Sequence, residues 1–230
     1  MAVEQPLATD PLSAPDHSLL HRIIAADLAA PVKSIAIDSY GNLSLATPVY
    51  EDIRIVPTSF DVHGNTDPSL VSYQPTGAGV VTKLYEFALN DLAYFSIQVP
   101  HNYKEGTDIT VHLHWTPGSR GNEEGTNKVG WKVIYSWANI DGTFPVMATA
   151  DLSDACTSTD DAHLMTPEVV IDGHTIAKII SSMLVCQVTR TDTGTDDTWA
   201  SSTTGQLPLL LEVDFHFQIN TLGSRTETIK

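Results

Sequence analysis

Four segments of the chain alternate strictly between apolar and polar residues, and this period of two constrains the fold more than any other feature. The segments cover residues 94–99, 108–115, 131–137 and 211–219. On the last of them, one face carries Leu211, Val213, Phe215, Phe217 and Ile219. Such alternation is typical of antiparallel strands that bury one face and leave the other polar. The sequence therefore predicts strands that pack on one side only.

Weaker strand patterns and turn signals lie between these segments and complete an all-β chain. The weaker patterns cover residues 80–89, 144–150, 163–171 and 182–190. About eight strands, without a repeat of fixed period, favour an antiparallel two-sheet sandwich, most naturally a jelly roll, over residues 51–230. The loops at 151–161 and 192–204 are rich in Ser, Thr and Asp, so they are predicted to face solvent.

Residues 1–50 have a different pattern and form a second predicted unit, an extended N-terminal arm. Three prolines among the first fifteen residues favour an extended start. Apolar residues at helical spacing predict a short helix over residues 19–28, which Pro31 ends. Alternating residues on either side of a Tyr-Gly-Asn turn then predict a β-hairpin over residues 32–45.

Neither element of this arm is expected to be stable alone. A helix of about ten residues is marginal in water, and so is an isolated hairpin. We therefore expect the arm to become ordered by docking on a partner, with a disordered leader as the alternative. The predicted docking residues are His17, Leu19, Leu20, Arg22, Ile23 and Ile24.

The charge balance limits the partners of the chain. Lys and Arg number 12 against 28 Asp and Glu, which gives a formal net charge of −16. A protein that binds nucleic acid or anionic lipid needs a clustered basic face, so neither partner is expected. No apolar run approaches the ~20 residues that span a bilayer, and the first residues lack a secretory signal. Two cysteines form no disulfide scaffold, which favours synthesis in a reducing cytoplasm.

Three histidines are the sharpest candidates for chemistry. His112 and His114 point the same way from one predicted strand, and His216 lies on another polar strand face. Two imidazoles at this spacing can bind Zn²⁺ when a neighbouring strand adds a third. The run from Val111 to Trp115 also resembles, over five residues, the metal-binding strand of α-type carbonic anhydrases. We favour the simpler interpretation, that these imidazoles face solvent or a subunit interface without a metal.

Other patterns of catalysis and cofactor binding are missing from the sequence. No nucleophile elbow, zinc-protease helix, phosphate-binding glycine loop or dinucleotide fingerprint is found. Cys186 lies on an apolar strand face and is predicted to be a core residue. The aspartates between 192 and 197 do not have EF-hand spacing. From these patterns we expect no catalytic residue, no metal and no cofactor.

Trp199 stands apart from the other tryptophans because it sits in a polar stretch. Trp115, Trp131 and Trp137 belong to the alternating apolar sets, whereas Trp199 is surrounded by Asp, Ser and Thr. An exposed aromatic side chain commonly marks a protein contact or a ligand platform, such as one for a sugar. The alternative is a small local core within the loop.

Several motifs spread along the chain resemble those of tailed-bacteriophage virion structural proteins. They cover residues 10–22, 32–42, 99–115, 135–144 and 212–225. The first two belong to the arm, which resembles leaders that precede diverse phage structural modules. The others follow the predicted strands of the sandwich.

The resemblance implies a non-enzymatic jelly-roll protein on the capsid surface of the virion, made in the host cytoplasm. It implies a homotrimer that decorates or cements the shell by docking its arm on the major capsid protein. In that role His112, His114 and His216 would be structural or interfacial. A head or tail fibre, or a receptor-binding module that recognises glycans through Trp199, is the alternative. A zinc enzyme built on the three histidines is a third interpretation.

Overall fold

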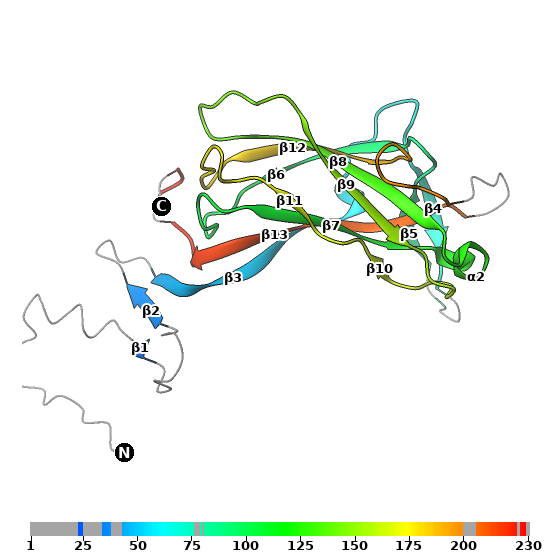
Figure 1. The fold of residues 1–230 in the computed structure, drawn as a ribbon, viewed down its shortest axis with the longest axis horizontal. Helices are drawn as coiled ribbons and strands as arrows, with labels where there is room; N and C mark the ends of the chain where they lie inside the picture. Colours follow the sequence, from blue (N-terminus) through cyan, green and yellow to red (C-terminus); the bar gives the residue numbers. More distant parts are fainter. Residues whose placement is uncertain are drawn as a thin grey trace, which may run out of the picture.

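The computed structural model describes residues 23–24, 34–37, 43–75, 79, 81–199, 206–224 and 226–228, and these form two antiparallel sheets (Figure 1). The first sheet contains β3 (Leu43–Ile55), β7 (Ile109–Thr116), β11 (Val169–Ile171) and β13 (Leu209–Thr221). The second contains β6 (Leu92–Gln98), β8 (Lys128–Ala138), β9 (Ala148–Ala155) and β12 (Met183–Arg190). The predicted two-sheet sandwich is confirmed.

The order of these eight strands identifies the sandwich as a jelly roll. In the first sheet the pairing runs β3-β13-β7-β11, and in the second it runs β6-β12-β8-β9. Counted along the chain, these are strands one, eight, three and six, facing strands two, seven, four and five. The chain thus crosses repeatedly between the sheets, which is the topology of two Greek keys wrapped into a jelly roll.

Short elements extend this framework at its edges. A hairpin of β4 (Ser69–Tyr73) and β5 (Thr82–Glu86) pairs with the start of β13, and β10 (Leu164–Met165) pairs with β7. The connections contain η1 (Pro57–Ser59), η2 (Gly118–Arg120) and α2 (Gly121–Glu124). In the described part of the chain, no helix has the length and apolar character needed to cross a membrane.

The core lies between the two sheets and contains the apolar residues that the alternation predicted. Phe215 and Phe217 of β13 are almost fully buried, as is Trp131 of β8. The ring of Trp131 meets Phe87 edge-on, at 5.3 Å between ring centroids. Cys186 is buried in the same core, as predicted. Strict alternation therefore places one face of each strand in the shared interior.

Two loop predictions need correction. Strand β9 (Ala148–Ala155) covers the first residues of the segment 151–161, which was predicted to be a loop facing solvent. Its polar residues are not typical of a buried strand, because β9 lies at the edge of its sheet. In the described part of the chain it pairs only with β8. In the segment 192–204 the structure describes residues 192–199, and most of these are exposed, but Thr195 and Trp199 are buried.

The arm contains strands where a helix was predicted. Ile23 and Ile24 form β1 (Ile23–Ile24), which pairs with β2 (Ser34–Ile37). The helix prediction is therefore wrong at these two residues, and the rest of 19–28 lies outside the described residues. β-branched isoleucine favours strands, and a short helix without a docking surface cannot compete with strand pairing.

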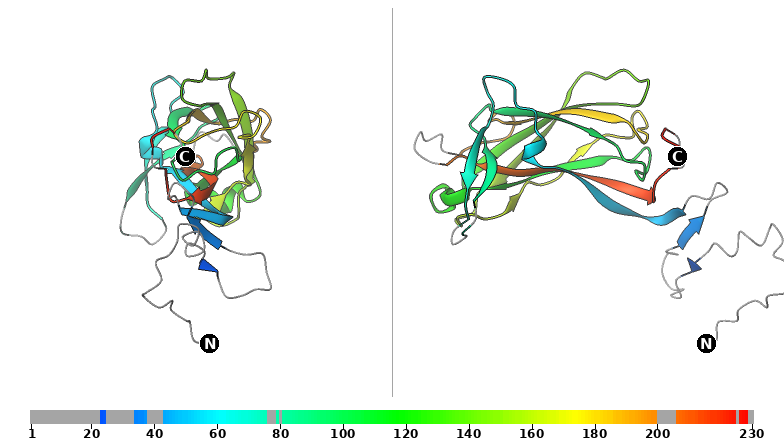
Figure 2. Two further views of the ribbon diagram at one scale, coloured as in Figure 1. Left: turned by 90° about the vertical axis from the view of Figure 1, so that its left-hand side faces the viewer. Right: turned by 180° about the vertical axis from the view of Figure 1, so that it is seen from behind.

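The predicted hairpin is present and continues into the sandwich. β2 pairs with the first residues of β3, with Ile35 opposite Leu45 and Ile37 opposite Leu43. The sequence placed the end of the arm at residue 50, and β3 runs through that position without a break. Figure 2 shows β3 leaving the body of the sandwich, with β1 and β2 lying beyond it.

Candidate functional site

The three candidate histidines meet on the outer face of the first sheet. His112 and His114 lie two residues apart on β7, so both point away from the core. Strand β13 runs antiparallel beside β7 and places Asp214 opposite His112, and Glu212 opposite His114. His216 follows Asp214 on the same face of β13. The pairing of two strands thus gathers three imidazoles and two carboxylates.

One carboxylate oxygen lies among the three imidazoles. Oδ2 of Asp214 is 3.7 Å from Nε2 of His112, 3.9 Å from Nε2 of His114 and 3.6 Å from Nε2 of His216. The Nε2 atoms of His112 and His114 face each other at 2.9 Å. The His112 and His216 rings meet edge-on, with 4.6 Å between centroids. We call His112, His114, Asp214 and His216 the histidine cluster.

A ring of further polar residues surrounds the histidine cluster. Nε2 of His163 lies 2.7 Å from Nδ1 of His114. Glu168 contacts Nδ1 of His216 at 3.1 Å, and Asp52 of β3 contacts its Nε2 at 3.2 Å. These partners fix the orientation of both rings, since each ring is held through more than one nitrogen contact.

Burial shifts the pKa values of His112, His114 and Asp214. The side chains of His112 and Asp214 are only 1% and 6% exposed. Burial lowers the pKa of His112, and the nearby His216 lowers it further. Burial also lowers the pKa of His114, with the neighbouring His112 adding to the effect. Burial raises the pKa of Asp214, helped by the charge of Asp52.

Two buried polar atoms of the cluster have no hydrogen-bond partner. They are Nδ1 of His112 and Oδ1 of Asp214. Buried polar groups are normally satisfied, so these two atoms leave hydrogen-bonding capacity unused at the site. Ligand atoms of His112, His114 and Asp214 all lie within 4.8 Å of one another, as do those of His112, Glu168 and His216. Imidazole and carboxylate groups at these distances can bind a transition-metal ion or relay a proton.

The sequence identified part of this site. The sequence pattern indicated His112, His114 and His216 as candidates, and the structure brings all three together. It did not select Asp214, His163 or the carboxylates around them. Alternation along β13 already placed Asp214 on the face of His216, which was a usable signal. The pairing of β10 with β7, which brings His163 close, has no such signal in the sequence.

The prediction that Trp199 is an exposed contact is wrong. Its side chain is buried in the core, where it meets Trp115 edge-on at 6.0 Å between ring centroids. One of its polar neighbours, Asp197, has its side chain buried in an ion pair with Arg190. A platform for sugars or a subunit contact therefore cannot be assigned to Trp199.

Most of the predicted docking residues cannot be placed. His17, Leu19, Leu20 and Arg22 lie outside the described residues. For Ile23 and Ile24 only the backbone is described, as strand β1.

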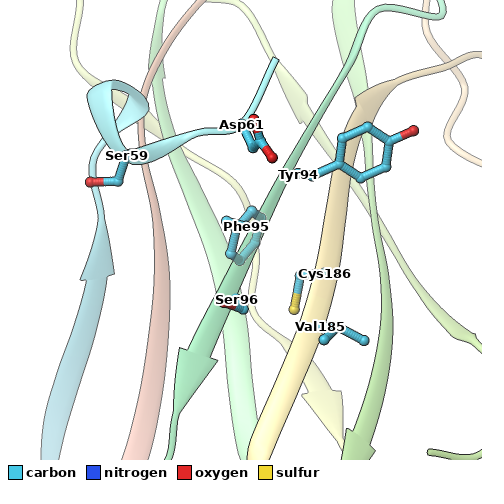
Figure 3. Close-up of a pocket in the computed structure, with 7 residues that line it drawn as sticks. All are labelled: Ser59, Asp61, Tyr94, Phe95, Ser96, Val185 and Cys186. Atoms are coloured by element: carbon cyan, nitrogen blue, oxygen red, sulfur yellow. The ribbon is translucent and has the colours of Figure 1, made fainter. Parts of the chain in front are cut away.

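A separate open hollow lies at the edge of the second sheet (Figure 3). Its volume is about 410 Å³, and Figure 3 shows Tyr94, Cys186 and Asp61 among its lining residues. Burial raises the pKa of Cys186 to about 12, so its thiol is protonated and unreactive at neutral pH. Nothing in this hollow resembles a nucleophile with a base beside it.

The fold and site define an eight-stranded jelly roll that carries a buried histidine cluster on its outer face. Searches of protein-family models and of curated proteins find no match to the chain. Solved structures with a related shape include the VP2 subviral particle protein of infectious bursal disease virus, with 14% identity and a TM-score of 0.37. That match covers 86% of this chain and 36% of VP2.

Two further matches come from other classes of protein. One is the stem and receptor-binding domain of the spike protein P1 from bacteriophage PM2, at 9% identity and a TM-score of 0.28, covering 76% of this chain and 97% of that one. The other is a cycloisomaltooligosaccharide glucanotransferase from Paenibacillus, at 11% identity and a TM-score of 0.39. It covers 70% of this chain, which spans only 18% of that enzyme. Because these TM-scores are low, the fold assignment rests on the strand order.

Proposed function

We propose that this chain is a non-enzymatic structural protein of a virus particle. In its proposed role it is a trimeric decoration protein that docks on the major capsid protein through residues 1–50. The observation that carries the proposal is the way strand β3 leaves the sandwich. β3 pairs with β13 over most of its length, and its first residues also pair with β2, which pairs in turn with β1 and so extends the first sheet.

The small sheet of β1, β2 and the start of β3 needs a partner. In Figures 1 and 2 it lies beyond the end of the sandwich, with β1 and β2 away from the second sheet. Short strands without an opposing layer bury little apolar surface and are marginally stable alone. Among the described residues, the outer strand β1 pairs only with β2, and an open strand edge of this kind is one that another chain can extend.

Exposed apolar side chains at the same end support docking. Val49 and Tyr50 of β3 are 45% and 65% exposed, and Leu222, just after β13, is 75% exposed. The register places Val49 opposite Ile219, so these side chains lie near the point where β3 leaves the sandwich. Apolar groups gathered beside an open strand edge are typical of a protein-binding surface.

Two properties of the whole chain agree with this role. A jelly roll is one of the folds from which viral capsid proteins are built, although the fold alone does not fix a function. The formal net charge of −16 suits a surface that faces solution rather than packaged nucleic acid. The resemblance of the arm to phage leaders supports the same role.

Particle binding tests the proposal. Particles of the virus whose genome encodes this chain are stripped of it and then mixed with full-length protein or with a variant lacking residues 1–42. Sedimentation should recover the full-length protein with the particles and leave the truncated variant in solution. Binding of the truncated variant at full-length levels would overturn the docking role of the arm.

A paired surface substitution provides a finer test. The double substitution Val49→Ser and Tyr50→Ser in β3 should weaken sedimentation with particles. Val146→Ser, at a 94% exposed position on a loop, should not. Quantitative mass spectrometry of intact particles then gives the copy number. Hundreds of copies support decoration of the shell. A few copies would instead indicate the fibre or receptor-binding alternative, and no copies would refute a virion role.

A further inference from the structure

We propose that the histidine cluster binds one transition-metal dication of the Zn²⁺ class. The proposed protein ligands are Nε2 of His112, Nε2 of His114 and Oδ2 of Asp214, whose ligand atoms all lie within 4.8 Å of one another. The sequence predicted no metal, because the strand register that brings Asp214 to the two histidines is not visible in the sequence. This site is independent of the proposed virion role.

The distances between the ligand atoms fit a single small ion. Ligand atoms that bind tetrahedral zinc at ~2.0–2.1 Å lie about 3.3 Å from one another. The Nε2 atoms of His112 and His114 are 2.9 Å apart, and Oδ2 of Asp214 is 3.7 and 3.9 Å from them. Small rotations of the side chains would therefore bring these three ligand atoms to metal-binding positions.

The charge of the site calls for a cation. Asp214 is buried, and among the described residues the basic groups within ion-pair distance of it are the three imidazoles. The neighbouring Glu212 differs, because it pairs with Arg54 at 2.6 Å. A dication bound beside Asp214 would compensate this buried carboxylate.

One neighbouring residue, His163, is placed like an outer-shell residue of a metal site. A metal-bound histidine usually hydrogen-bonds through its other ring nitrogen, which fixes the ring and its tautomer. Nδ1 of His114 has such a partner in His163, at 2.7 Å. The backbone framework is also rigid, since the ligands come from two paired strands.

The donor set selects the type of metal. Imidazole with one carboxylate suits Zn²⁺ and its neighbours Co²⁺ and Ni²⁺, whereas Ca²⁺ and Mg²⁺ prefer oxygen ligands throughout. Three protein ligands leave one position of a tetrahedral ion to a water molecule. The ion would join β7 to β13 through their side chains.

Metal titration of untagged full-length protein tests this inference. The protein is dialysed against EDTA, mixed with Zn²⁺ and passed through gel filtration, and bound zinc is measured by mass spectrometry. We expect one zinc per chain, a rise in the unfolding temperature, and with Co²⁺ the intense visible absorption of four-coordinate cobalt. Substoichiometric zinc without these changes would mean an adventitious ion only and would overturn the proposal.

Variants locate the ion. His114→Ala should weaken binding at least tenfold, and His163→Ala should weaken it by about 10- to 100-fold as an outer-shell change. His63→Ala is the matched control. His63 is exposed, pairs with Asp61 and does not belong to the histidine cluster. Circular dichroism of each metal-free variant confirms folding. Equal zinc binding by His114→Ala and His63→Ala would refute the assignment.

Discussion

The buried ion pair between Arg190 and Asp197 offers the sharpest test of how this sandwich is held together. The two side chains are 1% and 3% exposed. The guanidinium of Arg190 donates from Nε and Nη2 to the two oxygens of Asp197, each at 2.9 Å. The same carboxylate accepts hydrogen bonds from the backbone N–H groups of Gly130 and Trp199. Asp197 therefore joins β12, β8 and the segment that carries Trp199.

Asp197→Asn should destabilise the protein by about 3–5 kcal/mol, because it leaves a buried guanidinium without its counter-charge. For a chain of this size that corresponds to a fall in unfolding temperature of roughly 6–20 °C. Urea unfolding followed by tryptophan fluorescence measures the change and also reports on Trp199.

The adjacent aspartate provides a matched control. Asp196 pairs with Lys128 at 2.7 Å, but the two side chains are 70% and 45% exposed. Asp196→Asn should therefore change the free energy of unfolding by less than about 1 kcal/mol. Equal effects of Asp196→Asn and Asp197→Asn would refute the reasoning that burial makes the Arg190 pair indispensable.

Two further predictions concern titratable side chains. Metal-free protein should lose stability on acidification from about pH 7 towards about pH 5.5. The pKa values of His112 and His114 are lowered in the folded protein, so the unfolded state binds more protons in this pH range. Each of the two histidines contributes up to about 1.4 kcal/mol per pH unit. Urea midpoints across this range check the slope, and His114→Gln should make it shallower; an unchanged slope would contradict the burial argument. Cys156 and Cys186, with pKa values of about 11 and about 12, should not react with Ellman's reagent in the native protein near pH 8 and should both react in denaturant. A native thiol that reacts within seconds would show that the core opens readily.

The sequence predicted the strands better than their arrangement. Alternation in β13 indicates the buried face directly, because the large apolar side chains of Phe215 and Phe217 need to be buried against another layer. Strand β4 was missed, since its burial does not alternate: Leu70 is exposed and only Tyr73 is buried. The jelly-roll order depends on pairings between strands distant along the chain, which no local pattern encodes.

The candidate site was only partly predictable for the same reason. The spacing of His112 and His114 fixes that both share a face, whatever the fold. That Asp214 lies opposite His112 depends on the register of β13 against β7. The prediction for Trp199 was wrong for a different reason, because its side chain packs against Trp115 in the core although the residues around it in the sequence are polar.

The continuity of β3 has a mechanical consequence. Seven consecutive register pairs, from Ile55 with Val213 to Val49 with Ile219, join β3 to β13. Tension applied to the N-terminal end of β3 would run along this antiparallel ladder. Its hydrogen bonds would then be loaded together in shear, not peeled apart one after another. The chain could therefore transmit a pulling force from its N-terminal segment to its core without first unfolding at a hinge.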